Sequence, residues 1–365
     1  MFRKAKRTFK MTTLHFTAIL VVAATVAKFD CARATDAAEL AQRRAIAIAD
    51  QARFQAPMGW TWGSLLNADG ARLRFGWVEA AKPMRGVIVV APSFQAPAEE
   101  YFETARDLSN SGFAVWILDR RGQGGSARWP DAERRAHLEG GWREVRDLRQ
   151  FTLLVQSHNP HAQAYLIGES LGGLVGLRLL HDSPGLFAAA AFSSPGIDFQ
   201  TNGVTREVLV AAVASACGSG RCREYAPTQR DWSFDAEAGG PNDPTKDDRD
   251  RALALQGLLL SHPELREDGA TNGFVATLFK EAETEQARGW PESIDTPVLF
   301  GFTPKDQIAR ADVIQSVCHR IPRCTLVKFE TSGHALFNDS DETRTVWLRQ
   351  LTAFLNRHAF ASSGR

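Results

Sequence analysis

The sequence has 365 residues, of which 44% are hydrophobic and 23% are charged, as in an ordinary soluble globular protein. This length favours one large core with an insertion over two full domains. The formal net charge is +1 and its basic excess gathers at the N-terminus, so the charge balance gives no indication of nucleic-acid binding.

The N-terminal residues have the pattern of a secretory signal peptide. Five basic residues lie within the first ten, an apolar stretch follows at about 14–27, and small residues at 32–34 have the spacing that signal peptidase cleaves. We assign residues 1–34 to this signal and expect a secreted or periplasmic protein. An uncleaved membrane anchor is the less favoured alternative, because the apolar stretch is short. Cleavage before Thr35 removes seven basic residues and one acidic residue, which changes the net charge from +1 to −5.

The chain after the signal begins with a helix pattern and a hairpin pattern. Residues 36–55 are alanine-rich with apolar residues on one face, which predicts a helix on the outside of the fold. Two strand patterns, 61–66 and 72–78, flank Asn67-Ala68-Asp69-Gly70, a typical hairpin turn. The short apolar run at 87–91 predicts a strand buried on both faces, as in a parallel sheet.

Strand and helix patterns then alternate along the chain. The expected elements are a helix at 98–111, a strand at 113–118, a helix at 141–158, a strand ending at Gly168, a helix after Ser170 and a strand at 187–192. After an interruption they are a strand at 296–302, a helix at 308–319, a strand at 325–329 and a helix at 342–356. Such alternation predicts an α/β fold with a mainly parallel sheet and helices on both faces.

The interruption divides the chain into a core and a cap. In residues 196–291 the strand patterns stop, and two helix patterns occur near 251–261 and 274–288. We interpret this segment as a cap inserted between strands 6 and 7 of the sheet. Residues 35–195 and 292–365 then form the core.

The strand ending at Gly168 runs into Gly168-Glu169-Ser170-Leu171-Gly172, a G-x-S-x-G pattern. Strand, sharp turn and helix is the arrangement that presents a serine nucleophile at the carboxyl edge of a sheet. Glycine at 168 and 172 removes side chains that would collide in so tight a turn. The N–H of Leu171 and the helix dipole favour negative charge near the Ser170 hydroxyl. The pattern alone is common, so its support must come from other residues.

Two further residues complete a candidate catalytic triad. A serine hydroxyl needs a base within hydrogen-bond reach and a carboxylate that orients this base. Asp306 follows the strand at 296–302 and His334 follows the strand at 325–329, so both fall at the edge that carries Ser170. The chain order serine, acid, histidine is typical of hydrolases that use a serine on such a turn.

Each member of this triad has an alternative. Asp198, after the strand at 187–192, is a second candidate for the acid, and Glu330 is a third. Asp306 could instead cap the helix that follows it, and His334 could be a loop histidine with no catalytic role.

Four cysteines remain once the signal is removed, and they form two close pairs. Cys217 and Cys222 lie five positions apart, and Cys318 and Cys324 lie six apart. In an oxidising compartment such pairs predict two local disulfides. A zinc site made of all four thiolates is the alternative, which the spacing disfavours.

Three segments together resemble the α/β-hydrolase family. They are the elbow 168–173, the segment 118–126 (Leu-Asp-Arg-Arg-Gly-Gln-Gly-Gly-Ser) and the segment 333–339 (Gly-His-Ala-Leu-Phe-Asn-Asp). They look most like the branch of monoacylglycerol lipases and bacterial lysophospholipases, and the resemblance extends over about 87–355. It implies that Asp119, in the second segment, shapes a loop beside the site and is not catalytic.

The resemblance also implies an oxyanion hole made of two backbone N–H groups. Aligned through Tyr101, these are the N–H groups of Phe94 and Leu171. Many members have His-Gly at this place, whereas this chain has Pro92-Ser93-Phe94-Gln95. A backbone donor survives a change of side chain, so we still expect the hole to form.

Together the residues and the resemblance predict a serine carboxylic-ester hydrolase that acts on lysophospholipid or monoacylglycerol through an acyl-enzyme. No metal, organic cofactor or nucleic acid is expected, and the expected partner is a small-molecule or lipid ester, with transient contact at a membrane surface as an option. The sequence does not indicate an oligomeric state. One alternative is a serine aminopeptidase, in which Glu264, Glu267 or Glu281 of the cap would bind the free amine. Another is a non-catalytic binding protein of the same fold.

Overall fold

The computed structural model describes residues 36–139, 143–201, 203–240 and 248–359. Eight strands form one sheet in the order β1-β2-β4-β3-β6-β7-β9-β10. They are β1 (Thr61–Leu66), β2 (Arg72–Val78), β3 (Gly86–Ala91), β4 (Phe113–Leu118), β6 (Ala164–Glu169), β7 (Ala189–Ser193), β9 (Val298–Phe302) and β10 (Cys324–Lys328). β2 pairs antiparallel with β1 and β4, and every other pairing in this sheet is parallel. The predicted hairpin and the mainly parallel sheet are confirmed.

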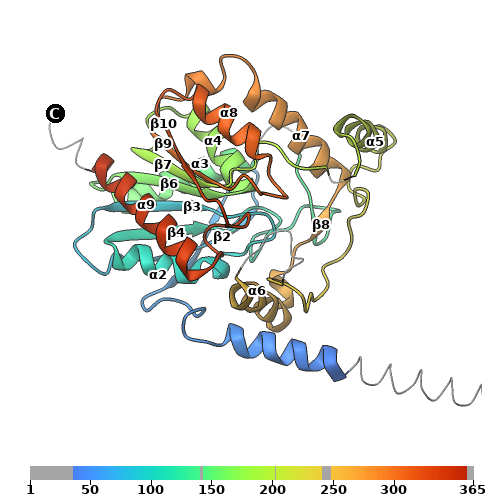
Figure 1. Cartoon of the computed structure of the whole chain (residues 1–365), viewed down its shortest axis with the longest axis horizontal. Helices are drawn as coiled ribbons and strands as arrows, with labels where there is room; N and C mark the ends of the chain where they lie inside the picture. Colours follow the sequence, from blue (N-terminus) through green and yellow to red (C-terminus); the bar gives the residue numbers. More distant parts are fainter. Residues whose placement is uncertain (1–35, 140–142, 202, 241–247, 360–365) are drawn as a thin grey trace, which may run out of the picture.

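Helices cover both faces of this sheet (Figure 1). Those of the core are the 3-10 turn η1 (Ala98–Tyr101), α2 (Phe102–Asn110), α3 (Arg143–His158), α4 (Leu171–Asp182), α8 (Ala311–Arg320) and α9 (Asp341–Ala359). Side chains of α2 and α9 share one apolar cluster with Ile88 and Val90, while those of α3, α4 and α8 share another with Val87 and Val89. Successive residues of β3 point to opposite faces, so both faces of this strand are buried as its sequence predicts.

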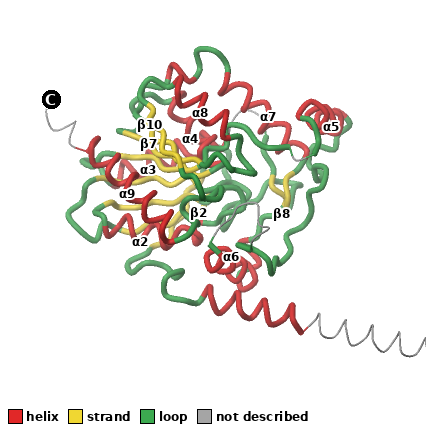
Figure 2. The backbone as a smooth tube through the Cα atoms, in the orientation of Figure 1, coloured by secondary structure: helices red, strands yellow, loops and turns green. Residues whose placement is uncertain are grey.

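The segment between β7 and β9 forms the insertion. It contains α5 (Arg206–Gly218), α6 (Arg249–Ser261), the 3-10 turn η2 (Pro263–Leu265), the strand β8 (Asp268–Ala270), α7 (Asn272–Gln286) and the 3-10 turn η3 (Pro291–Ser293). The predicted helices at 251–261 and 274–288 correspond to α6 and α7. The sequence analysis missed α5 and β8; β8 pairs with β5 (Arg135–Ala136) in a second, two-stranded sheet. Loops concentrate between the main sheet and these elements (Figure 2).

A helix at 36–49 lies on the outside of the molecule, as predicted, although it ends six residues early. Its buried residues Ala45 and Ile48 pack against Leu253 and Ala254 of α6. A side chain at Gly257 of α6 would overlap the Ala45 carbonyl oxygen, so the two helices cross in close contact. The helix therefore packs against the insertion.

The predicted disulfides Cys217–Cys222 and Cys318–Cys324 are both formed, with Cα–Cα distances of 4.1 and 5.4 Å. The first joins the end of α5 to the loop after it, and the second joins α8 to the start of β10. Because each thiol is bonded within its own pair, the zinc alternative is wrong.

The predicted signal at 1–34 lies outside the described residues. Within the described ranges, none of the helices has the length and apolar character needed to span a bilayer.

Loss of the Cys318–Cys324 bond should destabilise the fold. The bond closes a loop with a sequence separation of 6. Without it the unfolded chain gains conformational entropy, which lowers the free energy of unfolding by about 2 kcal/mol. We expect the double variant Cys318→Ser/Cys324→Ser to show this loss in guanidinium unfolding. Mass spectrometry of the unreduced wild type should show both linkages, and four free thiols would refute the pairing.

Candidate active site

Ser170 lies between β6 and α4 in a strained backbone conformation. Its φ is 48° and its ψ is −113°, a region that residues other than glycine rarely adopt. The Ser170 N–H donates to the carbonyl of Ser193 at 3.0 Å, and the N–H of Gly196 donates to the carbonyl of Ser170 at 2.8 Å. Neighbouring backbone therefore holds the strain, as in a nucleophile elbow.

The two elbow glycines are required by close backbone contacts. A Cβ on Gly172 would overlap the carbonyl oxygen of Ala91 at the end of β3, and a Cβ on Gly168 would lie 2.7 Å from the carbonyl oxygen of Gly172. The first turn of α4 can thus approach β3 only without side chains at these positions.

Asp306 and His334 meet at the carboxyl edge of the sheet. His334 Nδ1 lies 2.8 Å from Asp306 Oδ2, and both residues are buried. The other carboxylate oxygen, Oδ1, accepts the N–H groups of Ile308 and Ala309 at 2.8 and 2.9 Å. Asp306 therefore holds its own loop and contacts the imidazole at once, whereas the alternative that it caps the following helix is wrong, because α8 begins at Ala311 with Arg310 as its N-cap.

The second imidazole nitrogen of His334, Nε2, forms no hydrogen bond with any described residue. This buried nitrogen is therefore not bonded to the Ser170 hydroxyl in this state. Catalytic hydrogen bonds are often long before substrate binds. With Nδ1 held by the carboxylate, the free nitrogen is the one available for proton transfer.

The other candidate acids have different partners. Asp198 is buried between Arg206 Nη1 at 2.5 Å and Arg310 Nη1 at 3.3 Å. Glu330 is exposed and pairs with Lys328 at 2.8 Å. Among the three acids, only Asp306 contacts His334 in the described part of the chain.

The two candidate oxyanion donors lie on well-held segments. Within the described ranges, the N–H groups of Phe94 and Leu171 donate to none of the backbone carbonyls. On either side of Phe94, the Ser93 N–H donates to Tyr101 Oη at 3.0 Å and the Gln95 N–H donates to Glu267 Oε2 at 3.3 Å. The backbone of this loop is therefore fixed on both sides of the Phe94 N–H.

Asp119 has a structural role. Its carboxylate accepts the N–H groups of Ala98 and Gly125, both at 2.8 Å, and pairs with Arg74 at 2.5 Å. These bonds join three segments beside the site. They match the expectation that Asp119 is not catalytic.

The insertion closes over the site through contacts that the sequence analysis missed. Gln95 Nε2 donates to the carbonyls of Glu267 and Asp268 at 3.0 and 3.1 Å, and Arg120 pairs with Glu267 at 2.7 Å. The ring of Phe274 lies 5.2 Å from that of Phe94. Ser170 is only 4% exposed, so little of its surface is accessible to solvent. No local motif could have paired residues so distant in sequence.

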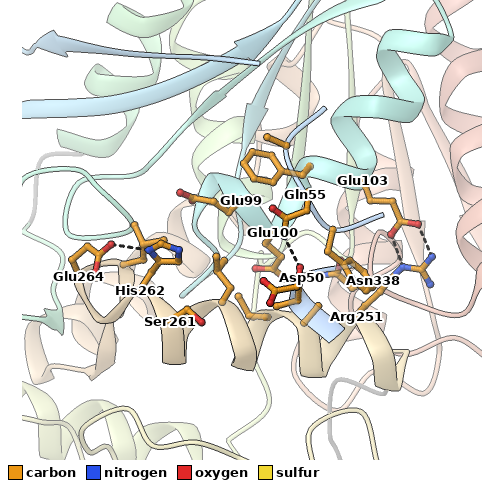
Figure 3. Close-up of a pocket in the computed structure, with 18 of the residues that line it drawn as sticks. Asp50, Gln55, Glu99, Glu100, Glu103, Arg251, Ser261, His262, Glu264 and Asn338 are labelled. Atoms are coloured by element: carbon orange, nitrogen blue, oxygen red, sulfur yellow. Dashed lines mark hydrogen bonds and ion pairs between the residues drawn. The ribbon is translucent and has the colours of Figure 1, made fainter. Parts of the chain in front are cut away.

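A separate hollow lies between the insertion and the core. It has a volume of about 420 Å³ and is walled by α6, the end of the N-terminal helix and the start of η1. Figure 3 shows Glu100 and Asn338 on its wall, and Asn338 Nδ2 donates to Glu100 at 2.5 Å. Burial and the nearby Glu169 raise the pKa of Glu100 to about 8. Neither Ser170 nor His334 lines this hollow.

Comparisons with known proteins show the family of this chain. The family model described as serine aminopeptidase, S33 matches residues 82–341. Lysophospholipase L2 of Escherichia coli K12 is 25% identical over 305 residues, covering 76% of this chain and 83% of that protein. A monoacylglycerol lipase of Mycolicibacterium smegmatis is 30% identical over 156 residues, covering 42% of this chain and 52% of that protein.

Solved structures with the same fold include a soluble variant of the monoglyceride lipase of Saccharomyces cerevisiae, with a TM-score of 0.67 and 16% identity over 84% of this chain and 96% of that one. A carboxyl esterase of Bacillus coagulans gives a TM-score of 0.66 with 13% identity, over 83% of this chain and all of that one.

The fold, the site and these likenesses define an α/β-hydrolase whose enzyme class is serine ester hydrolase. The resemblance to monoacylglycerol lipases and lysophospholipases is confirmed at this level. The chain belongs to the serine aminopeptidase S33 family.

Alanine at Gly172 should disrupt the elbow. The added methyl would overlap backbone of β3, and such overpacking costs about 1–3 kcal/mol. We expect Gly172→Ala to lower the unfolding free energy by this amount and to lose most activity. Gly218 near the end of α5 has open space around its Cα, so Gly218→Ala is the matched control and should not destabilise. Equal stability of the two variants would contradict the close approach.

Glu144 at the start of α3 should make stability depend on pH. It is buried, which raises its pKa to about 7 from 4.5. Between these values the folded state holds a proton that the unfolded state releases, so its contribution to stability falls as pH rises from about 4.5 to 7. The melting temperature of Glu144→Gln minus that of wild type should rise with pH over this window, and this difference should stay constant at higher pH. The exposed Glu79→Gln controls for loss of charge, and a flat difference for Glu144→Gln would refute the shift.

Proposed function

We propose that Ser170, His334 and Asp306 form a catalytic triad that hydrolyses carboxylic esters. The observation that carries this is the 2.8 Å contact between His334 Nδ1 and Asp306 Oδ2, which leaves Nε2 uncommitted. Ser170 Oγ attacks the ester carbonyl carbon while its proton passes to His334 Nε2. His334 then protonates the departing alcohol, and water activated by the same nitrogen hydrolyses the acyl-enzyme.

The proposed oxyanion donors are the N–H groups of Phe94 and Leu171. Negative charge on the carbonyl oxygen develops only in the tetrahedral state, so donors held in advance lower the barrier. In comparable sites, loss of one such donor raises the activation free energy by about 3 kcal/mol. Support comes from the lack of a backbone acceptor for either group within the described ranges and from the bonds that fix Ser93 and Gln95.

The proposed substrates are lysophospholipids or monoacylglycerols. The relatives that carry those names support this class, and Phe274 adds an apolar ring of α7 next to the oxyanion loop. The proposed site of action is the periplasm or the exterior, supported by the signal pattern and by two disulfides, which persist in oxidising compartments.

A serine aminopeptidase is the second candidate, favoured by the description of the family model. Such an enzyme needs a free carboxylate for the substrate amine. Glu267 pairs with Arg120 and Glu281 pairs with Arg178, and the exposed Glu264 lies 3.1 Å from His262. Two of the three predicted carboxylates are thus engaged by arginines, which favours the ester reaction.

Ester turnover should depend on Ser170. We expect the mature protein to hydrolyse p-nitrophenyl esters, monoacylglycerols or lysophospholipids, and Ser170→Ala to abolish this. A fluorophosphonate probe should label wild type at Ser170. Hydrolysis of aminoacyl anilides alone would favour the peptidase, and a wild type without turnover or labelling would favour a binding protein.

The two candidate acids provide a matched pair of variants. Asp306→Asn should lower kcat by a factor on the order of 10³–10⁴, because the imidazole loses its orienting charge. Asp198→Asn should keep kcat within about 3-fold, since Asp198 contacts arginines rather than His334. The reverse pattern would reassign the acid. Circular dichroism would verify that both variants fold.

A further inference from the structure

Glu169 is a buried carboxylate that the proposed reaction does not use. It directly precedes Ser170 and is 1% exposed. Burial raises its pKa, and hydrogen bonding to Tyr101 and the charge of His334 oppose that rise. Burying a carboxyl group raises the free energy of the folded state unless hydrogen bonds compensate it. The hydrogen-bond partners of Glu169 therefore indicate its role.

One carboxylate oxygen connects the elbow to the oxyanion loop. Tyr101 Oη donates to Glu169 Oε2 at 2.9 Å and accepts the Ser93 N–H at 3.0 Å. Tyr101 is fully buried. Because Ser93 directly precedes Phe94, two hydrogen bonds relate the nucleophile's segment to the first oxyanion donor.

The other oxygen connects the elbow to the histidine loop. Ser193 Oγ donates to Glu169 Oε1 at 3.3 Å and accepts the Leu336 N–H at 3.2 Å. Leu336 lies two residues after His334. The backbone carbonyl of Ser193 also accepts the Ser170 N–H at 3.0 Å, so this residue contacts both the elbow and the loop that carries the base.

We propose that Glu169, Tyr101 and Ser193 are positioning residues that fix the oxyanion loop and the histidine loop relative to Ser170. This inference rests on the proposed function, because it assigns a role to the Phe94 N–H and to His334. The two oxygens of the Glu169 carboxylate accept hydrogen bonds from Tyr101 and from Ser193, so one group is connected to both loops at once. Hydrogen-bonded groups in a dry interior hold geometry more firmly than apolar contacts of the same size.

Tyr101→Phe is the sharpest variant, because it removes one oxygen and keeps the ring. The Phe94 N–H interacts with the oxyanion and not with the ground-state ester, so kcat should fall by about 10–100-fold while KM changes by less than about 3-fold. The Ki of a trifluoromethyl ketone should rise by the same factor as kcat falls. Ser170 Oγ adds to the carbonyl carbon of this ketone, the serine proton passes to His334 Nε2, and the carbonyl oxygen becomes an oxyanion in the hole.

Tyr165→Phe is the matched control. Tyr165 is also buried, and it lies on β6, where its hydroxyl donates to Gln163 at 2.8 Å. Loss of this hydroxyl should leave kcat, KM and Ki within about 2-fold of wild type. Fluorophosphonate titration counts active sites in each preparation, so that partial unfolding does not pass for a loss of kcat.

Ser193→Ala tests the connection to the histidine loop, and Glu169→Gln tests the carboxylate that both connections share. Ser193→Ala frees the Leu336 N–H and should lower kcat by about 10-fold with KM little changed. Glu169→Gln keeps one acceptor oxygen, so it should lose less activity than Glu169→Leu. These variants also decide the question if Tyr101→Phe does not fold.

Folded Tyr101→Phe and Ser193→Ala variants with wild-type kcat and wild-type Ki would overturn the inference. So would a rise in KM that matches the fall in kcat, because that signals general loosening. If the wild type itself neither turns over esters nor reacts with the fluorophosphonate, the proposed function fails first, and the inference falls with it.

Discussion

The left-handed backbone of Ser170 is the constraint on which the site depends. A φ of 48° is unfavourable for serine, and it persists because the elbow is held from several directions. Gly172 allows α4 to touch the end of β3, and the backbone of Ser193 and Gly196 bonds to Ser170 on both sides. Packing and hydrogen bonding around this edge of the sheet thus compensate the strain at one residue, the proposed nucleophile.

Buried ion pairs connect the insertion to the core around this edge. Arg120 of the core pairs with Glu267 of the insertion, and Arg251 of α6 pairs with Glu103 of α2 at 2.8 Å. Isolated buried charges would be unfavourable, whereas paired ones specify a geometry. Together with Gln95, these pairs hold the insertion against the core beside Ser170, Asp306 and His334, which are all buried.

Much of the core could be predicted from the sequence because its signals are local. Buried strands are continuous apolar runs, and polar residues directly after them fall at one edge of a parallel sheet, which is why Asp306 and His334 were placed together. The missed features are non-local. β8 exists only through its pairing with residues 135–136. In α5 the apolar residues lie on all sides of the helix, although only Val213 and Ala216 are buried, so no single apolar stripe marks the helix in the sequence.

The loop after β3 shows why an unusual sequence can preserve a site. Phe94 stands where many family members have another side chain, yet the group proposed to act there is its N–H. What fixes that N–H is the loop backbone on either side, through Tyr101 at Ser93 and Glu267 at Gln95. The side chain at 94 is thus free to change and here packs on Phe274. The position of this backbone donor therefore depends on Tyr101 and Glu267, which bond the loop on either side of it, and not on the donor's own side chain.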